Sequence, residues 1–391
     1  MAEETELKLR LKPDDLRGLR TTLTRLAHAP PVSQHLVSVY FDTPDLDLLR
    51  RGWALRVRRV GRHWIQTLKG GGSVAGGLHR REEREARLTR PLPDPLLLAA
   101  ELPDIAADTL APVFRTDFRR QLWRFSKDEA ELEVALDQGE IAAGDQKVPV
   151  LELELELRRG PVARLYDLAL VLARDFALAP EARSKAERGY QLFQGLAGLP
   201  VKAQAVSLPE HVTVEDAFVI LASQCLEQIQ RNQPGVLETE EAEFVHQMRV
   251  GLRRLRALFR LFRPLLGEGA IAGWREELMW LARTLGEARD WEVLEEEVLP
   301  ACAKALTGRA TLTDLARRIR QQRRAARRQA REAVASPRYG QLMLGLGRWL
   351  VARDWRAGLD EPRRAALDGP LRPQAVAWLK ARHRKLLARG R

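Results

Sequence analysis

Two strand-like runs with a charge at every second residue constrain this chain most strongly. The first is ETELK at residues 4–8, and the second is LELELEL at residues 151–157. Residues two apart share one face of a β-strand, so each run separates its carboxylates from its leucines. Carboxylates in a row repel one another and need cations nearby, either metal ions or basic side chains. A sheet that contains both runs is therefore expected to hold a charged site.

Two further runs supply the cations. Bases alternate with apolar residues in LRVR at 55–58, and TLK at 67–69 ends on a lysine. An exposed sheet face with solvated charges is the alternative interpretation. The leucines opposite the carboxylates, such as Leu7 and Leu153, are too apolar to face water, so we expect them to pack outward against helices. The charged faces would then line the inside of a barrel and suit a metal-bound polyanion.

Residues 1–198 are predicted to form an α+β domain. Helix signals occur at 13–27 and 161–175, and the glycine-rich stretch 70–77 is predicted to be a flexible loop. Eight antiparallel strands can close into a barrel or tunnel. The predicted strands are 3–11, 35–42, 53–60, 63–69, 79–89, 114–125, 131–137 and 150–158.

Residues 208–391 are predicted to form an all-α domain. After a break at 195–209, which contains glycines and prolines, the hydrophobic period changes to 3.6 residues, which is typical of a helical bundle. The predicted helices are 213–232, 239–263, 271–286, 289–306, 312–334, 337–352, 361–368 and 373–389.

The remaining bulk features favour a cytoplasmic protein without a membrane partner. No apolar run approaches the roughly 20 residues that span a bilayer, and the charged N-terminus does not resemble a signal segment. The two cysteines, Cys225 and Cys302, provide neither a disulfide framework nor a metal-binding spacing.

The net charge of +12 is unevenly distributed. Residues 1–200 hold 31 Lys+Arg against 30 Asp+Glu, whereas residues 201–391 hold 34 against 23. A basic field of this kind attracts nucleic acid, an anionic membrane surface or polyphosphate.

The ordered motifs of residues 1–195 resemble the CYTH superfamily of triphosphate tunnel metalloenzymes. The ETELK run resembles the opening ExExK signature of that family. The other matching segments are YFDTP at 40–44, RGWALRVR at 51–58, WIQTLK at 64–69, DQG at 137–139, ELELE at 152–156 and SKAERGY at 184–190.

This resemblance implies an eight-stranded antiparallel tunnel that hydrolyses a triphosphate with a divalent metal, Mg²⁺ or alternatively Mn²⁺. Metal would be held by Glu4, Glu6, Glu152 and Glu154, and with Asp137 these form the implied catalytic set. The implied phosphate-binding cations are Lys8, Arg56, Arg58, Lys69, Arg81, Arg120, Lys185 and Arg188. The double arginines at 80–81 and 119–120 leave two of these assignments open by one residue.

Inorganic triphosphate is the preferred substrate among those of the family. Trp53, Trp64 and Trp123 are the only tryptophans available as a platform for a base or thiazolium ring in this half, and a bare triphosphate needs none. A thiamine or nucleoside triphosphatase is the rival enzyme. A non-catalytic polyphosphate-binding protein is the rival class, although an anion cage gains nothing from carboxylates.

The helical half carries a basic stripe that begins at His246 and continues with Arg249, Arg253 and Arg256. The segment HQMRVGLRRLR at 246–256, followed by LGEARDW at 285–291, resembles a CHAD domain. That resemblance implies polyphosphate binding through the four basic residues. A second basic series, at 317, 320, 324, 327 and 331, has few acids near it in sequence and favours an anion partner. No aromatic residue interleaves with this series, so nucleic acid is disfavoured.

The CHAD family usually has two four-helix halves, each with its own basic helix. Residues 379–387 resemble the start of the second half, so the CHAD-like domain is expected to be incomplete. Two explanations remain open: a fragment, or a half-domain that pairs with another copy in a homo-oligomer.

Overall fold

The computed structural model describes residues 2–196, 198–305 and 309–389. The chain forms two compact units, one made of residues 1–200 with 335–345, the other of 201–334 with 346–391. Within the described ranges, no helix combines the length and the apolar character that crossing a bilayer requires.

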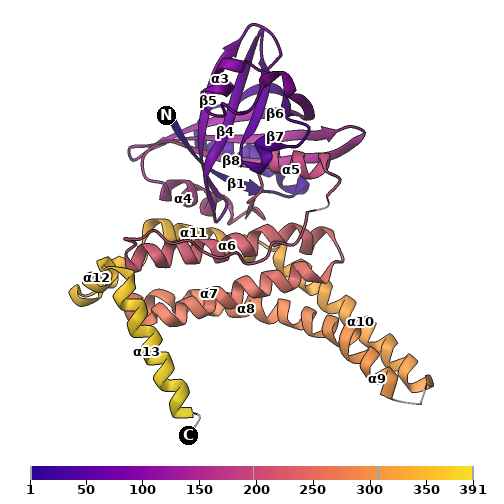
Figure 1. The fold of residues 1–391 in the computed structure, drawn as a ribbon, viewed down its shortest axis with the longest axis vertical. Helices are drawn as coiled ribbons and strands as arrows, with labels where there is room; N and C mark the ends of the chain where they lie inside the picture. Colours follow the sequence, from indigo (N-terminus) through magenta and orange to yellow (C-terminus); the bar gives the residue numbers. More distant parts are fainter. Residues whose placement is uncertain (1, 197, 306–308, 390–391) are drawn as a thin grey trace. The chain divides into compact units, whose positions relative to one another are not determined.

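Eight antiparallel strands close the first unit into a barrel (Figure 1). The neighbours run β5, β4, β3, β2, β6, β7, β8, β1, and β1 pairs with β5 to complete the ring. The predicted fold class is thus confirmed. The strands are β1 (Ala2–Arg10), β2 (Val32–Asp42), β3 (Ala54–Val60), β4 (His63–Ala75), β5 (Leu78–Leu88), β6 (Ala111–Lys127), β7 (Ala130–Ala143), β8 (Gln146–Arg159) and a short β9 (Ala179–Pro180) beside β1.

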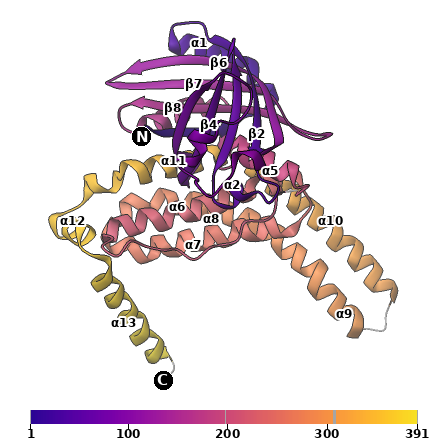
Figure 2. The same ribbon diagram turned by 45° about the horizontal axis from the view of Figure 1, so that its top comes forward.

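The leucine faces pack outward, as their alternation predicts. Leu7, Leu9 and Leu153 are fully buried, while the intervening carboxylates of Glu6 and Glu154 line the interior. Helix α4 (Ala163–Leu172) contacts β1 and β8, and α1 (Leu16–Ala27) lies against β6 (Figure 2). The other helical segments that precede α5 are η1 (Pro13–Asp15), α2 (Asp47–Arg50), α3 (Pro95–Ala99) and η2 (Ala107–Thr109).

The expected loop at 70–77 is instead mostly strand. Strand β4 continues to Ala75 and keeps pairing with β5 across a bulge between Gly70 and Gly72. A Cβ at Gly70 would lie 2.1 Å from the Trp53 ring, and Gly72 has φ +106°. These glycines permit a tight bulge rather than a disordered loop.

Helix α5 (Lys185–Phe193) is fastened to the barrel by contacts far apart in sequence. Ser184 caps it by accepting a hydrogen bond from the Glu187 N–H. The Tyr190 hydroxyl donates to Asp42 Oδ2 at 2.8 Å, and Asp42 also accepts backbone N–H groups at the start of α2. Gly189 leaves room for the Phe114 ring, to which a Cβ would approach within 2.1 Å. This docking directs the first turn of α5 toward the barrel interior.

The second unit is helical around an aromatic core that includes Phe218, Phe259 and Trp355. Helices α6, α7 and α8 run side by side (Figures 1 and 2). The break predicted at 287–288 is wrong, because Gly286 lies inside a continuous helix. The helical segments after residue 200 are α6 (Val214–Glu238), α7 (Ala242–Leu266), α8 (Glu268–Val293), η3 (Leu294–Val298), α9 (Leu299–Ala305), α10 (Arg309–Val334), α11 (Pro337–Ala352), η4 (Asp354–Gly358), α12 (Glu361–Asp368) and α13 (Leu371–Arg389), and residues 337–345 of α11 belong to the first unit.

Candidate active site

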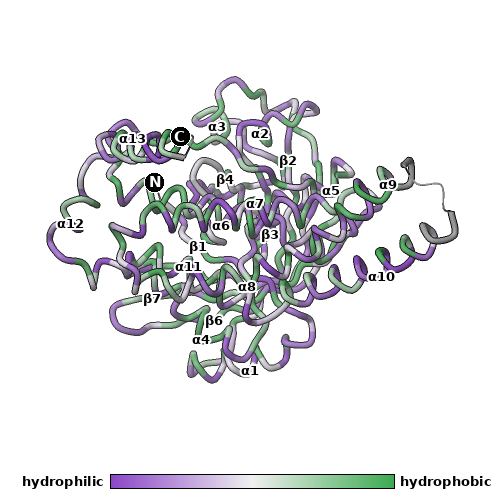
Figure 3. The backbone as a smooth tube through the Cα atoms, turned by 90° about the horizontal axis from the view of Figure 1, so that it is seen from below, coloured by the Kyte–Doolittle hydropathy of each residue, from purple (hydrophilic) through white to green (hydrophobic). Residues whose placement is uncertain are grey.

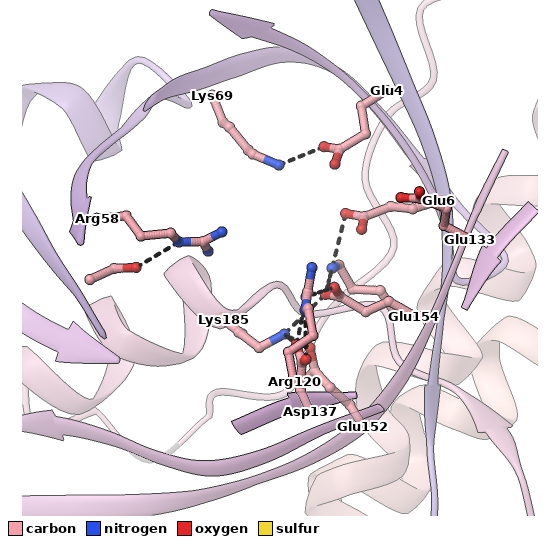
Figure 4. Close-up of polar contacts among 12 residues, drawn as sticks. Glu4, Glu6, Arg58, Lys69, Arg120, Glu133, Asp137, Glu152, Glu154 and Lys185 are labelled. Carbon is pink, nitrogen blue, oxygen red and sulfur yellow. Dashed lines mark hydrogen bonds and ion pairs between the residues drawn. The ribbon is translucent and has the colours of Figure 1, made fainter. Parts of the chain in front are cut away.

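The barrel encloses a cavity of about 440 Å³ whose walls are mainly charged (Figure 4). Carboxylates come from β1, β5, β7 and β8, and cations come from β1, β3, β4, β5, β6, β8 and α5. The charged side chains that line it are Glu4, Glu6, Lys8, Arg56, Arg58, Lys69, Arg81, Glu83, Glu85, Arg120, Arg124, Glu133, Glu154, Glu156, Arg158 and Lys185.

One group of carboxylates lies where β1 meets β8. Lys69 Nζ is 2.6 Å from Glu4 Oε2, and Lys8 Nζ is 2.9 Å from Glu6 Oε1. Glu156 is the cross-strand partner of Glu6. Burial and the neighbouring charge of Glu4 raise the pKa of Glu156 to about 7, despite its ion pair with an arginine. This group therefore has more negative charge than its own cations neutralise.

A second group of carboxylates consists of Asp137, Glu152 and Glu154, whose oxygens lie within 4.8 Å of one another. Lys185 Nζ is among them, 2.6 Å from Asp137 Oδ2 and 3.0 Å from Glu154 Oε1, and it also contacts Glu152. Arg120 donates to both oxygens of Asp137, at 2.8 and 2.7 Å, and contacts Glu154.

These contacts determine the protonation of the second group. Burial would raise all three pKa values, but Lys185 and other cations outweigh it and lower the pKa of Asp137 and Glu154. Burial dominates at Glu152, where the pKa is raised. Glu152 and Asp137 are almost completely covered and do not line the cavity. Arg188 approaches Glu152 from α5, with 3.2 Å between Nη1 and Oε2. Glu152, which was predicted to bind a metal, is thus paired with two basic residues of α5.

The opposite wall contains two adjacent arginines of β3 with different surroundings. Arg56 Nη2 lies 3.3 Å from Glu83 and 3.9 Å from Glu85. Arg58 donates to Ser38 Oγ at 3.0 Å and has no carboxylate within 4.0 Å among the residues that the structure describes. Burial, together with Arg56 and Arg120, lowers the pKa of Arg58 to about 9. Figure 4 shows its guanidinium pointing toward the side where the carboxylates lie.

The structure also shows which arginine of each double pair, 80–81 and 119–120, faces the cavity. Arg81 and Arg120 line the cavity, whereas Arg80 and Arg119 do not. Arg81 likewise has no carboxylate within 4.0 Å in the described part of the chain. Glu85 was not predicted as a site residue, although its alternation with Arg81 and Glu83 in β5 was a usable signal.

The tryptophans proposed as aromatic platforms do not line this cavity. Trp123, for example, points outward and donates to Thr24 Oγ1 at 3.1 Å. The aromatic rings that do line it are Tyr40 and Phe118. Tyr40 stacks on Phe114, and the Lys185 ammonium lies 4.9 Å from the centre of the Phe118 ring.

The predicted basic stripe of the second unit lies on α7. Arg253 and Arg256 are exposed, and His246 and Arg249 are half-buried. Arg249 Nη1 would be 2.7 Å from a Cβ at Gly286, and it has no hydrogen-bond partner among the described residues.

The second basic series, on the mostly hydrophilic helix α10 (Figure 3), is only partly available to an anion. Arg327 is buried, pairs with Glu292 and donates to the Glu241 carbonyl at 2.9 Å. Arg331 lies 2.7 Å from Glu240. The prediction of an anion-binding stripe is wrong for these two arginines, because acids distant in sequence neutralise them.

Two protein-family models match this chain. Residues 2–190 match the CYTH domain, and residues 220–391 match the CHAD domain. Together the matches cover most of both structural units.

Similar proteins are known for each half. A Haemophilus influenzae protein named inorganic triphosphatase is 34% identical over 195 residues, which is 49% of this chain and 55% of that protein. The chain thus spans about half the length of this relative. Among solved structures, the CHAD domain from the plant Ricinus communis is 36% identical, covering 42% of this chain and 54% of that one, with a TM-score of 0.37. A Hippeastrum protein described with a dominant triphosphatase activity is 19% identical. The match covers 50% of this chain and 98% of that chain, with a TM-score of 0.39.

Proposed function

We propose that this chain, whose two halves belong to the CYTH and CHAD domain families, hydrolyses inorganic triphosphate to pyrophosphate and phosphate inside its barrel. The observation that carries this proposal is a cavity in which Arg58 and Arg81 have no described carboxylate within 4.0 Å, while Glu4, Glu6, Glu154 and Glu156 line the same cavity. A polyphosphate anion would satisfy those arginines, and carboxylates across from it would be useful only with a metal ion. The name of the Haemophilus influenzae relative supports the same substrate.

The residues at the junction of β1 and β8 fit a divalent metal. Glu4, Glu6 and Glu156 offer hard oxygen donors, and the raised pKa of Glu156 favours further positive charge there. The Asp137 group is a poorer fit, because Lys185 Nζ already lies among its oxygens. A bound Mg²⁺ or Mn²⁺ would neutralise phosphate charge and orient the phosphoryl group for in-line attack.

The cations that line the cavity would hold the phosphate oxygens. Arg58 and Arg81 can donate to them without first leaving a described carboxylate, and Arg56 and Lys69 line the same cavity. Phosphoryl transfer depends mainly on positioning and charge neutralisation, which fixed guanidinium groups provide. Lys185 and Arg120 would keep Asp137 and Glu154 ionised and rigid beneath the site.

The aromatic surroundings favour an inorganic substrate over a nucleotide or thiamine triphosphate. Tyr40 already stacks on Phe114, with ring centres 4.4 Å apart, and the Phe118 ring has both Lys185 and Arg120 near it. Neither ring is left clear as a platform for a base.

The test is phosphate release from tripolyphosphate, ATP and thiamine triphosphate, each with and without Mg²⁺. Metal-dependent release confined to tripolyphosphate is expected. Glu6→Gln should lower turnover at least 100-fold, while Glu131→Gln, an exposed carboxylate of β7, serves as the matched control. Polyphosphate binding without release from any substrate would favour a non-catalytic binding protein instead.

We further propose that the α7 stripe binds polyphosphate. Arg253 and Arg256 are exposed without a carboxylate within 4.0 Å in the described residues, and the half-buried Arg249 has Nη1 4.0 Å from Asp290 Oδ1. Binding should therefore fall steeply with salt concentration. Binding that is insensitive to salt, or unchanged by Arg249→Ala with Arg253→Ala, would contradict this assignment.

A further inference from the structure

A second cavity, of about 580 Å³, is lined by residues of α1, β2, β6 and β7 that mostly point away from the barrel interior. Helix α1 passes over β6 in this region (Figure 2). Arg119 and Gln121 of β6 line it, and they alternate with Arg120, which lines the interior cavity. The full lining is Arg20, Ser33, Gln34, His35, Arg119, Arg120, Gln121 and Gln138. No described carboxylate is among these residues.

Strand register brings the basic and amide side chains of this cavity together. Arg119 of β6 is the cross-strand partner of His35 in β2 and of Gln138 in β7, so the three residues form one row across the sheet. Adjacent strands place such partners about 5 Å apart. Arg20 reaches the same row from α1 and donates from Nη2 to Gln138 Oε1 at 3.0 Å.

The polar groups of this cavity are incompletely satisfied. Neither Arg20 nor Arg119 has a carboxylate within 4.0 Å among the described residues. Arg20 Nε and Gln121 Oε1 are covered from solvent and have no hydrogen-bond partner there. His35 is bonded to Asp117 at 2.7 Å, and this carboxylate is not part of the lining. A covered donor without a partner is destabilising, so the arrangement favours a ligand with acceptor oxygens.

We propose that this outer cavity is a second anion site, which binds phosphate or pyrophosphate. The guanidinium groups of Arg20 and Arg119 match the oxygens of a phosphoryl anion and would hold it between α1 and β6. Gln121 Oε1 can accept a hydrogen bond from the hydroxyl group that such an anion keeps near neutral pH. The site adjoins the interior cavity through Gln34 and Arg120, and its ligand class is that of the products of the proposed reaction.

The two cavities share a wall, so the outer ligand would affect the inner site. Gln34 and Arg120 line both cavities. Arg120 is bonded to Asp137, which precedes the outer residue Gln138 in β7. A phosphoryl anion outside would therefore act on the strands that position Arg120 inside.

The test is calorimetric titration of the full, metal-free chain with phosphate and, separately, with pyrophosphate. Two classes of site are expected in the barrel unit, in addition to binding at the proposed α7 stripe. Arg119→Gln should weaken one class at least tenfold and leave the other, whereas Arg58→Gln should weaken the other. Arg17→Gln, an exposed arginine elsewhere on α1, is the matched control and should bind like the wild type.

Arg20→Gln should reproduce the effect of Arg119→Gln. Because Arg119 is exposed, Arg119→Gln should fold, and it keeps the test valid if Arg20→Gln does not. The proposal is overturned if Arg119→Gln retains both classes, if Arg17→Gln loses as much affinity, or if chloride at equal ionic strength displaces phosphate completely. Since binding is measured without turnover, an inactive barrel would not affect the result.

Discussion

The two arginines of β3 should respond oppositely to the same substitution. Arg58 is a half-buried cation without a carboxylate partner in the described residues, and its pKa is lowered well below its usual value, to about 9. This shift corresponds to about 5 kcal/mol of unfavourable free energy for the charged form. Arg58→Met removes the charge but also the hydrogen bond to Ser38. We therefore expect the ligand-free barrel to gain about 1–3 kcal/mol in the free energy of unfolding.

Arg56→Met is the matched control, because it removes a cation two residues away that faces the same cavity. It leaves Glu83 and Glu85 with fewer cations, so the barrel should lose about 1–3 kcal/mol. Native-state hydrogen exchange of the barrel strands reports this unit separately from the helical one. Tripolyphosphate with Mg²⁺ should stabilise the wild type more than either variant, since both lose phosphate contacts.

The pH dependence of the Arg58 effect has a defined sign. The folded pKa lies below the unfolded one, so the charged guanidinium destabilises the fold wherever it is protonated in both states. The difference between wild type and Arg58→Met should be constant from pH 6 to 8 and narrow above about pH 9. A variant less stable than the wild type, or equal effects of Arg58→Met and Arg56→Met, would refute the reasoning.

Three other changes test separate parts of the molecule. Tyr190→Phe removes the hydrogen bond to Asp42 but keeps the ring, and should lower the free energy of unfolding by about 1–2 kcal/mol in urea; no loss would mean that α5 docks without it. Although burial opposes it, nearby arginines lower the pKa of Glu181 to about 2. Acidification from pH 4.5 to 2 should therefore lower the free energy of unfolding of the wild type by about 3 kcal/mol more than that of Glu181→Gln. Equal pH dependence of the free energy of unfolding in the two proteins would contradict this. Changing both Arg253 and Arg256 to Ala should weaken polyphosphate binding at least tenfold in a titration and leave the rate of tripolyphosphate hydrolysis within twofold of the wild type. A large loss of hydrolysis would mean that the activity of the barrel depends on the α7 stripe.

The barrel could be predicted because its signal is local. Alternation of leucine and glutamate determines which face of β8 is buried, and all eight predicted strands form. Glycines misled the prediction where their role depends on distant residues. Gly70 accommodates the Trp53 ring inside a strand, and Gly286 accommodates Arg249 inside a helix. Neither partner can be identified from the residues next to the glycine.

The candidate site was predictable as a set of residues but not as a set of pairs. Alternation places Glu152 and Glu154 on the same face, yet α5 covers the first with Lys185 and leaves the second at the cavity. That distinction depends on the docking of α5 through Tyr190, a contact across 148 residues of sequence. Ion-pair partners are a tertiary property, so a strand pattern cannot show which cation remains free for a substrate.

The same principle changes the interpretation of the positive charge in the second half of the chain. Its excess of 34 bases over 23 acids suggested two anion-binding stripes, but folding distributes the acids unevenly. Glu292 and Glu295 lie against α10 and neutralise Arg327 and Arg323. Helix α7 receives few of these acids, and Arg256 remains exposed with no described carboxylate within 4.0 Å. Neutralising Arg253 and Arg256 on α7 should therefore reduce polyphosphate binding more than neutralising the paired Arg327 and Arg331 on α10.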